Sequence, residues 1–212
     1  MSATCVATVA AMMSPAPTAE AKTDLGRPRV MWQQCVERAL QCFPTGGGYH
    51  TGRNIPPGFR QTAWTGLDRA VRVTATGVCV DPYLATPSFC SSATYLLLLK
   101  SLELYEKTCG VMPPRKEWEY LKPYTVDHRP YPIQNDGVGA WGRANANGPG
   151  MAELAHELKI GTNLYIGTTG EYANLADRNE MFASIRRYDF MKIFWNDEIG
   201  KDERGHMVVV LG

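Results

Sequence analysis

The feature of this sequence that most constrains its fold is a long apolar run that begins shortly after a cysteine. Residues 87 to 102 read PSFCSSATYLLLLKSL, and the stretch from 95 to 99 is apolar on every face of a helix. A helix that is apolar all round is buried in a protein core. The sequence therefore predicts one long central helix from Ser88 to about Lys107, with Ser88 as its N-cap and Cys90 in its first turn.

Shorter patterns on both sides of this helix predict the other elements. Helices are expected at 28–43, roughly 59–70, 115–122 and from Pro149 onward, and extended segments at 71–80, 162–166, 189–197 and 206–212. The Gly- and Asn-rich segment DGVGAWGRANANGPG, residues 136 to 150, is predicted to be a loop. Helices first, then a loop-rich middle and antiparallel strands indicate the α+β class.

Length and charge exclude several classes of protein. The 212 residues suffice for one good-sized domain. A net charge of +1 provides no global attraction to nucleic acid or to an anionic membrane, so no nucleic-acid partner is expected. No run of about 18 apolar residues is present, and we therefore expect no transmembrane segment. The sequence leaves the oligomeric state open.

The first 24 residues differ in composition from the rest of the chain. They are rich in Ala, Thr and Ser and carry no charge before Glu20, and an Ala-Glu-Ala triplet there resembles a small-residue cleavage site. The basic n-region of a signal peptide is missing. Two interpretations stay open: a secretory leader, which implies a secreted or periplasmic protein, and a disordered tail, which leaves a cytoplasmic location open. Residues 25–212 are expected to form a single domain.

The cysteine spacing bears on metals and disulfides. The six cysteines are Cys5, Cys35, Cys42, Cys79, Cys90 and Cys109. None forms a C-x-x-C pair, so we expect neither a zinc ribbon nor a thioredoxin-type motif, and no metal or cofactor. On one helix Cys35 and Cys42 would lie about 10 Å apart, too far for a disulfide. Without Cys5 and Cys90 an even number of cysteines remains, which suits an oxidising compartment but leaves their pairing open.

Cys90 is the candidate nucleophile. Only a thiolate is strongly nucleophilic, and the unpaired N–H groups and dipole at a helix N-terminus favour negative charge there. Ser91 brings a hydroxyl into the same turn, and the N–H groups could also stabilise an oxyanion. Taken alone, a cysteine next to a leucine-rich stretch is more often a buried packing residue.

His206 is the candidate base. It follows Gly205 and opens the predicted strand that runs from Met207 to Leu211. A histidine at the start of a buried strand can hold its ring at a sheet edge, although a single histidine there is more often structural. The order of cysteine at a helix start, then an apolar strand, then a Gly-His strand is that of a papain-like cysteine peptidase.

The segments FCSSATY, YDFMKIFWND and GHMVVVLG together resemble the NlpC/P60 branch of the papain-like superfamily. In that family a Cys-Ser pair opens the helix, a Gly-Asp-aromatic strand follows, and a Gly-His-hydrophobic strand comes later. The resemblance covers roughly residues 80 to 212. It implies a papain-like core in which the central helix carrying the cysteine packs on an antiparallel sheet, with Cys90 as nucleophile and His206 as general base.

The same resemblance implies a function. Proteins of this family cut amide bonds next to D-amino acids in peptidoglycan stem peptides, through an acyl-enzyme. An upstream tyrosine lends its hydroxyl near the oxyanion in this family, and Tyr83 is the candidate here. A papain-like acyltransferase acting on another substrate, and a non-catalytic cell-wall binding module with a packing cysteine, are the alternatives.

This chain departs from the family pattern at several positions. Phe89 stands where many members have Asp, and Tyr188 stands where a glycine is usual. The separation between Cys90 and His206 is longer than usual, so the segment 136–150 and the helix after it look like an insertion. The third triad residue normally lies on a strand after the histidine, and the chain ends at Gly212. Either the chain is a fragment or another residue has that role, with Asn196 and Asp197 as candidates.

The Gly/Asn-rich segment supplies the remaining candidate substrate contacts. They are Trp141, Arg143, Asn145 and Asn147. The guanidinium of Arg143 would suit the carboxylates of a stem peptide. A long connection of the Ω-loop kind, without a role in binding, is the alternative.

Overall fold

The protein is described by a computed structural model, which divides the chain into two compact units. The first unit comprises Met1–Gln33 and Arg143–Gly212, and the second comprises Gln34–Gly142. The structure describes residues 6–11, 26–46, 49, 67, 69–75, 77–85, 88–110, 115–123, 133–134, 137–144, 151, 154, 162–166, 183–195 and 205–212. Helices α1 (Gly26–Leu40) and α5 (Gly139–Ala144) each begin in one unit and end in the other. The single domain expected over 25–212 stays a prediction.

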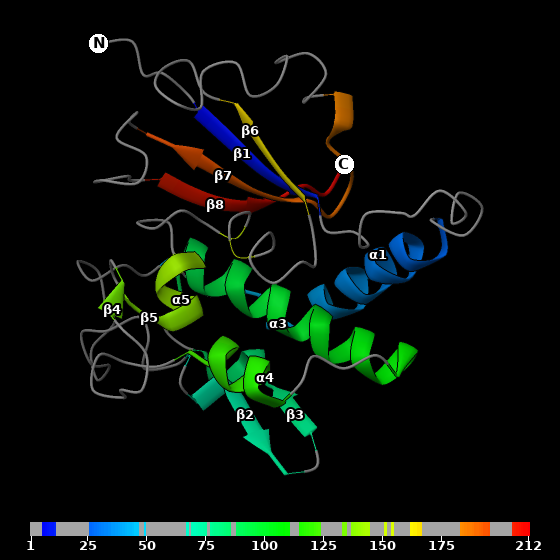
Figure 1. Ribbon diagram of the computed structural model, residues 1–212, viewed down its shortest axis with the longest axis vertical. Coiled ribbons are helices and arrows are strands. Elements are labelled where there is room, and N and C mark those ends of the chain that lie inside the picture. Colours follow the sequence, from blue (N-terminus) through cyan, green and yellow to red (C-terminus); the bar gives the residue numbers. More distant parts are fainter. Residues whose placement is uncertain are drawn as a thin grey trace. The chain divides into compact units, whose positions relative to one another are not determined.

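The first unit contains an antiparallel sheet of four strands. Its order is β6 (Thr162–Ile166), β1 (Val6–Ala11), β7 (Phe190–Phe194) and β8 (Gly205–Val209), as Figure 1 shows. The strands expected at 162–166, 189–197 and 206–212 are thereby confirmed, with the last two shorter than expected. Strand β1 comes from the segment interpreted as a leader or a tail, and which of these interpretations holds stays a prediction.

Strand β7 shows the alternation of a half-buried strand. Phe190, Lys192 and Phe194 are buried, while Met191 and Ile193 are half-buried. The buried face includes a lysine whose ammonium lies 4.1 Å from the centroid of the Phe194 ring, a cation–π geometry that partly offsets the cost of removing the charge from water. The four-carbon stem of Lys192 meanwhile fills space in the apolar layer.

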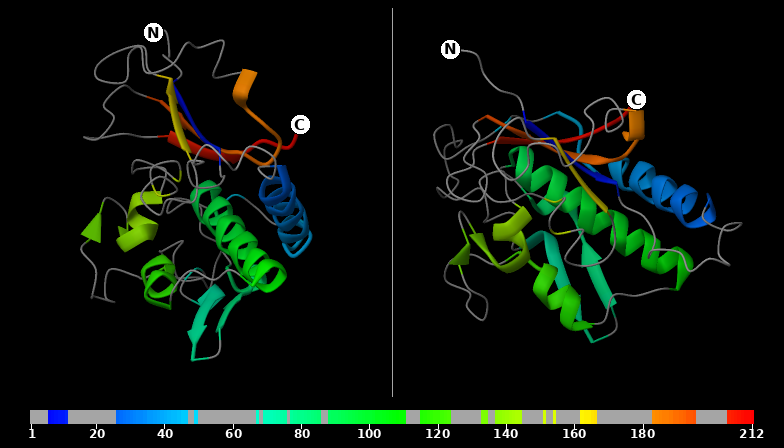
Figure 2. Two further views of the ribbon diagram at one scale, coloured as in Figure 1. Left: turned by 45° about the vertical axis from the view of Figure 1, so that its right-hand side comes forward. Right: turned by 45° about the horizontal axis from the view of Figure 1, so that its top comes forward.

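The second unit is built around helix α3 (Cys90–Cys109). Twelve of its side chains are buried, among them all five from 95 to 99, as an all-round apolar surface predicts. The hairpin formed by β2 (Val71–Thr74) and β3 (Gly77–Val80) and the helix α4 (Arg115–Leu121) lie beside α3 in both views of Figure 2. The long central helix, the helix at 115–122 and the extended segment at 71–80 are confirmed, the last as a hairpin.

A buried carboxylate joins α3 to the hairpin. Glu103 is 1% exposed, yet it accepts hydrogen bonds from the Val80 backbone N–H (3.2 Å), from Lys100 Nζ (2.8 Å) and from Lys107 Nζ (2.5 Å). Lys100 also donates to the Val80 carbonyl at 2.8 Å. The charge is tolerated inside because it is both paired and hydrogen-bonded.

Two local predictions are wrong. The residue that caps α3 is Phe89 rather than Ser88, because the side chain of Ser92 turns back to the Phe89 backbone and fixes the helix start there. The segment 136–150 is not a loop throughout: β5 (Gly137–Val138) pairs with β4 (Ile133–Gln134), and α5 follows. Its glycines suggested a loop, but the buried side chains of Ala140, Trp141 and Ala144 recur at helical spacing and stabilise a helix against the core.

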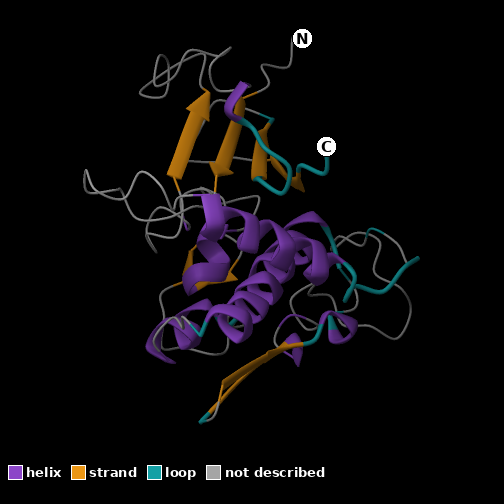
Figure 3. Ribbon diagram, turned by 90° about the vertical axis from the view of Figure 1, so that its right-hand side faces the viewer, coloured by secondary structure: helices purple, strands orange, loops and turns teal. Residues whose placement is uncertain are grey.

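Other expected elements are described only in part. Of the helix expected at 59–70, Leu67, Arg69 and Ala70 are helical, and of the helix expected from Pro149, Met151 and Leu154 are helical and buried. The other residues of both segments lie outside the described residues. Coloured by secondary structure in Figure 3, each unit contains both helices and antiparallel strands. The α+β class is thereby confirmed.

Within the part of the chain that the structure describes, we find no helix with both the length and the apolar character needed to cross a membrane. This agrees with the expectation of no transmembrane segment for those residues.

Candidate functional site

Cys90 is the first residue of α3, at the boundary between extended and helical backbone. Phe89 before it has extended dihedral angles (φ −145°, ψ −177°), and the side chain of Cys90 is half-buried. The first turn of the helix contains no acidic residue. The first N–H groups of a helix lack intrahelical acceptors, and the helix dipole is positive at this end. A thiolate at Cys90 would therefore meet favourable electrostatics and no opposing carboxylate in its own turn.

Hydroxyl groups hold the backbone on both sides of Cys90. Ser92 Oγ accepts from the Phe89 N–H at 2.8 Å and lies 2.9 Å from both the Phe89 carbonyl oxygen and Ser88 Oγ. Thr94 Oγ1 donates to the Cys90 carbonyl at 2.8 Å. Ser92 and Thr94 thus position the backbone on either side of the cysteine at the start of a buried helix.

A tyrosine hydroxyl lies against the thiol. Tyr49 Oη donates to Cys90 Sγ at 3.4 Å, and Ser91 Oγ lies 3.8 Å from the same sulfur. Burial of the hydroxyl, reinforced by the hydrogen bond to Cys90, raises the pKa of Tyr49 to about 12. Tyr49 is therefore a protonated hydrogen-bond donor at neutral pH, able to stabilise charge on the sulfur or on an oxygen bound nearby.

Tyr49 was not predicted from the sequence. This residue follows three glycines and lies 41 positions before Cys90, so no local periodicity connects the two. The only signal was an aromatic residue next to a histidine in a glycine-rich segment. Tyr83, which was the candidate, lies in a 3-10 turn (Pro82–Leu84) with its side chain 64% exposed and its N–H donated to Asp81. A role of Tyr83 in substrate binding stays a prediction.

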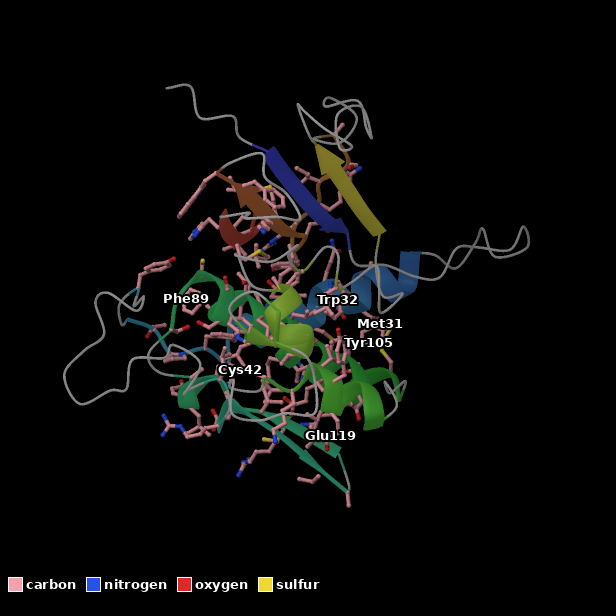
Figure 4. The ribbon with its side chains drawn as sticks, turned by 60° about the vertical axis from the view of Figure 1, so that its left-hand side comes forward. Met31, Trp32, Cys42, Phe89, Tyr105 and Glu119 are labelled. Carbon is pink, nitrogen blue, oxygen red and sulfur yellow. The ribbon has the colours of Figure 1, made fainter. Side chains whose placement is uncertain are left out.

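Aromatic rings pack beneath the start of α3. Trp141 is fully buried, with its ring centroid 6.3 Å from that of Phe89 in an edge-on arrangement and 5.4 Å from that of Tyr95. Figure 4 shows Phe89 at the beginning of α3. Tyr95 in turn donates its hydroxyl to the Leu121 carbonyl at 2.5 Å. Trp141 is thus a core residue in a helix and not part of an exposed loop, which corrects the surroundings expected for it.

His206 is the second residue of β8 and lies opposite Ile193 of β7. Its neighbours Gly205 and Met207 are buried, whereas His206 is half-buried, so the imidazole lies on the other face of the strand. Gly205 is required by packing: a Cβ there would clash with the Ile193 carbonyl oxygen and lie 3.1 Å from Lys192 Cε. Gly205 therefore allows β8 to lie close to β7, while the imidazole of the adjacent His206 stays half-buried on the other face.

The turn before β7 contains a residue with left-handed backbone. Tyr188 has a positive φ of 72°, a conformation that glycine adopts without strain. Asp189 holds this turn through its carboxylate, which accepts from the Arg186 N–H at 2.7 Å. The guanidinium carbon of Arg187 lies 4.7 Å from the centroid of the Tyr188 ring. Because Tyr188 is not a glycine, its left-handed backbone is strained.

Most of the other residues predicted to form the site are not among the residues that the structure describes. Arg143 is placed as part of α5 but its side chain is not described, and Asn145, Asn147, Asn196 and Asp197 lie outside the described residues. Ser91 is fully buried beside the thiol. No cluster of three or more His, Cys, Asp or Glu side chains that could hold a metal occurs among the described residues.

Cys90 belongs to the second unit and His206 to the first, and each is described within its own unit. Their pairing as thiol and base stays a prediction. Comparison of the chain with family models, with curated proteins and with solved structures finds no match. The resemblance to the NlpC/P60 branch accordingly rests on the sequence segments quoted above alone.

Proposed function

We propose that this protein is a cysteine hydrolase of the papain-like, NlpC/P60 type that cleaves amide bonds in peptidoglycan stem peptides. The observation that carries the proposal is the environment of Cys90. A half-buried thiol at the first position of a buried helix, in contact with a tyrosine hydroxyl, suits nucleophilic catalysis better than core packing. The substrate class comes from the sequence resemblance, and it implies that the protein acts outside the cytoplasmic membrane.

The proposed chemistry has two halves. His206 accepts the thiol proton of Cys90, and the thiolate attacks the substrate carbonyl to form a tetrahedral oxyanion. N–H groups of the first turn of α3 and the Tyr49 hydroxyl, which already reaches the sulfur, are the donors available to this oxyanion. His206 then protonates the leaving amine, which yields a thioester on Cys90. Water, activated by His206, hydrolyses that thioester and restores the thiol.

Thiol reactivity tests the first half of this scheme. We expect iodoacetamide at neutral pH to label Cys90 well before Cys42 and Cys79, which are also half-buried and serve as internal references. His206→Ala should slow labelling of Cys90 several-fold and leave the two references unchanged. Peptide mass spectrometry gives each rate separately. Equal labelling rates at all three cysteines would refute an activated Cys90.

Product analysis tests the second half. Purified peptidoglycan incubated with the protein should release fragments with new free amines, and mass spectrometry should place water at the cleaved bond. Cys90→Ala should abolish release while the thermal melting curve stays close to that of the unmodified protein. Transfer of the acyl group to an added amine in place of water would identify an acyltransferase. Binding to peptidoglycan without turnover in either protein would identify a binding module.

A further inference from the structure

The residue directly before the candidate nucleophile is aromatic. Phe89 is the N-cap of α3, and its Cα lies about 3.8 Å from that of Cys90, as across any trans peptide bond. Its side chain is half-buried, so part of the ring is exposed at the start of the helix (Figure 4). The fully buried Trp141 packs against this ring, with the two centroids 6.3 Å apart in an edge-on arrangement. The neighbour of the nucleophile therefore presents a partly exposed ring that is fixed from below.

A second aromatic side chain contacts the sulfur itself. Tyr49 donates its hydroxyl to Cys90 Sγ at 3.4 Å, and its side chain is 50% exposed. Cys90, Tyr49 and Phe89 all belong to the second unit of the chain. A ligand whose reacting carbon approaches the sulfur would therefore meet exposed aromatic surface from two different segments.

The start of α3 is a poor place for a charged group of a ligand. The first turn contains no acidic residue, and the helix dipole is positive at this end. This dipole opposes the attraction that a cation would have for the ring faces. An anion would be favoured by the dipole but disfavoured by the negative faces of the rings. An apolar group gains from burial against the rings and is affected by neither field. The surroundings of the thiol therefore favour an uncharged, apolar group.

We propose that Phe89 and Tyr49 form an apolar subsite beside Cys90, which selects substrates that have an uncharged, apolar residue next to the scissile amide. Phe89 is then a specificity-determining residue. This inference rests on the proposed hydrolase function and adds to it the kind of residue that the site accepts. In a stem peptide it directs cleavage to an amide that adjoins an apolar residue such as alanine, and away from an amide flanked only by charged residues.

Alkylating reagents that share one reactive group test the subsite at the thiol. N-benzyl-2-chloroacetamide carries a phenyl ring, and two analogues carry an ammonium or a carboxylate in its place. The folded protein is treated with each reagent at neutral pH, and fragment spectra of the tryptic peptide 73–100 give the labelling rate of Cys90 apart from that of Cys79. The free thiol N-acetylcysteine amide gives the intrinsic rates of the reagents. Relative to that thiol, we expect Cys90 to prefer the benzyl reagent over each charged analogue about tenfold, as partial burial of a phenyl ring predicts.

Pairs of uncharged variants test the role of each ring. Phe89→Leu keeps an apolar side chain and should keep most of the preference, whereas Phe89→Asn should reduce it nearly to that of the free thiol. Tyr49→Phe keeps the ring without its hydroxyl and should keep the preference, whereas Tyr49→Ala should lower it. Each comparison uses a ratio of two reagents, so a change in the reactivity of the thiol itself cancels.

Three results would overturn the proposal. The first is a preference at Cys90 of the unmodified protein equal to that of the free thiol, which requires no variant to fold. The second is a faster reaction with either charged reagent, again relative to the free thiol. The third is a benzyl preference that is unchanged in Phe89→Asn.

Failure of the subsite and failure of the hydrolase can be distinguished, because the reagent ratio at Cys90 is measured without substrate turnover. If peptidoglycan is cleaved, product masses should place an apolar residue at the cut, and Phe89→Asn should lower kcat/KM for that cut about tenfold. Cleavage only between charged residues would overturn the subsite and leave the hydrolase standing. A tenfold benzyl preference without any cleavage would support the apolar subsite and count against the hydrolase.

Discussion

The two candidate catalytic residues are held by opposite means. At the start of α3, Cys90 is positioned by side chains added around it, since Ser92 and Thr94 make several hydrogen bonds to the adjoining backbone. At the start of β8, the position of His206 depends on the lack of a side chain at its neighbour, because only glycine fits at position 205. The first arrangement shares its stabilisation among several contacts, whereas the second depends on a single close approach. The two should therefore respond very differently to substitution.

The largest effect is expected at the strand. Gly205→Ala places a methyl group against the Ile193 carbonyl and the Lys192 stem, and the sheet must move to accept it. We expect a loss of about 2 kcal/mol or more in the free energy of unfolding, measured by urea denaturation. Gly110→Ala serves as a comparison for backbone strain without steric contact, because its position has a positive φ of 66° but open space around it. If Gly205→Ala left the free energy of unfolding unchanged, steric contact would not be the reason for the glycine at position 205.

A smaller effect is expected at the turn before β7. Tyr188→Gly relieves a left-handed backbone and Tyr188→Ala does not, while both remove the ring that packs near Arg187. The Gly variant should therefore be more stable than the Ala variant by about 1 kcal/mol. At Arg187, which has an ordinary φ, the same two substitutions should give the reverse order because glycine is normally the less stable choice. Urea unfolding of the four variants checks this, and the same order at both positions would contradict it.

At the start of α3 the loss should be about 1 kcal/mol. Ser92→Ala removes the acceptor of the Phe89 N–H and the partner of Ser88, whereas the contacts of Thr94 remain. Ser101→Ala is a matched control: it is equally buried in the same helix, but its hydroxyl only donates to the Leu97 carbonyl at 2.6 Å. Thermal or urea unfolding should show a clearly smaller loss for Ser101→Ala. Equal losses would mean that burial of the serine, and not its place at the helix start, determines the effect.

The smallest effect concerns pH. Burial, with the charge of Glu103 in addition, raises the pKa of Glu106, against the hydrogen bond from Trp118. The folded protein thus holds the Glu106 proton more tightly than the unfolded chain, so this contribution to stability is present below the unfolded pKa, about 4.3, and is lost as the pH rises through the folded value.

Glu106→Gln should remove that dependence. The stability of the unmodified protein relative to Glu106→Gln should fall between about pH 4 and pH 7. Urea midpoints of the two proteins across this range measure the difference, in which the other titrating groups cancel. A difference that grows in favour of the unmodified protein at higher pH would show that the ionised carboxylate is stabilised by its partners.

The sequence predicted the elements whose periodicity is strong. The uniform apolar run after Cys90 indicated a buried helix, and the apolar and aromatic residues of DFMKIFWND indicated a strand. Helix α5 was missed because its glycines outweighed the spacing of Ala140, Trp141 and Ala144. Strand β1 was missed because VATVAA consists mostly of small residues and shows little alternation. Tyr49 could not be found, since its contact with Cys90 arises only from the folding of a segment far along the chain.

The sheet order carries a consequence for synthesis of the protein. Strand β1, near the start of the chain, pairs with β7 from Val6 opposite Phe194, and with β6 on its other side. Most of the chain must therefore leave the ribosome before β1 finds either neighbour, whereas the second unit is one continuous segment with short-range partners such as β2 and β3. Non-local pairing of this kind is slow. The helix that bears Cys90 should consequently be formed during translation, and the strand that bears His206 should be secured last.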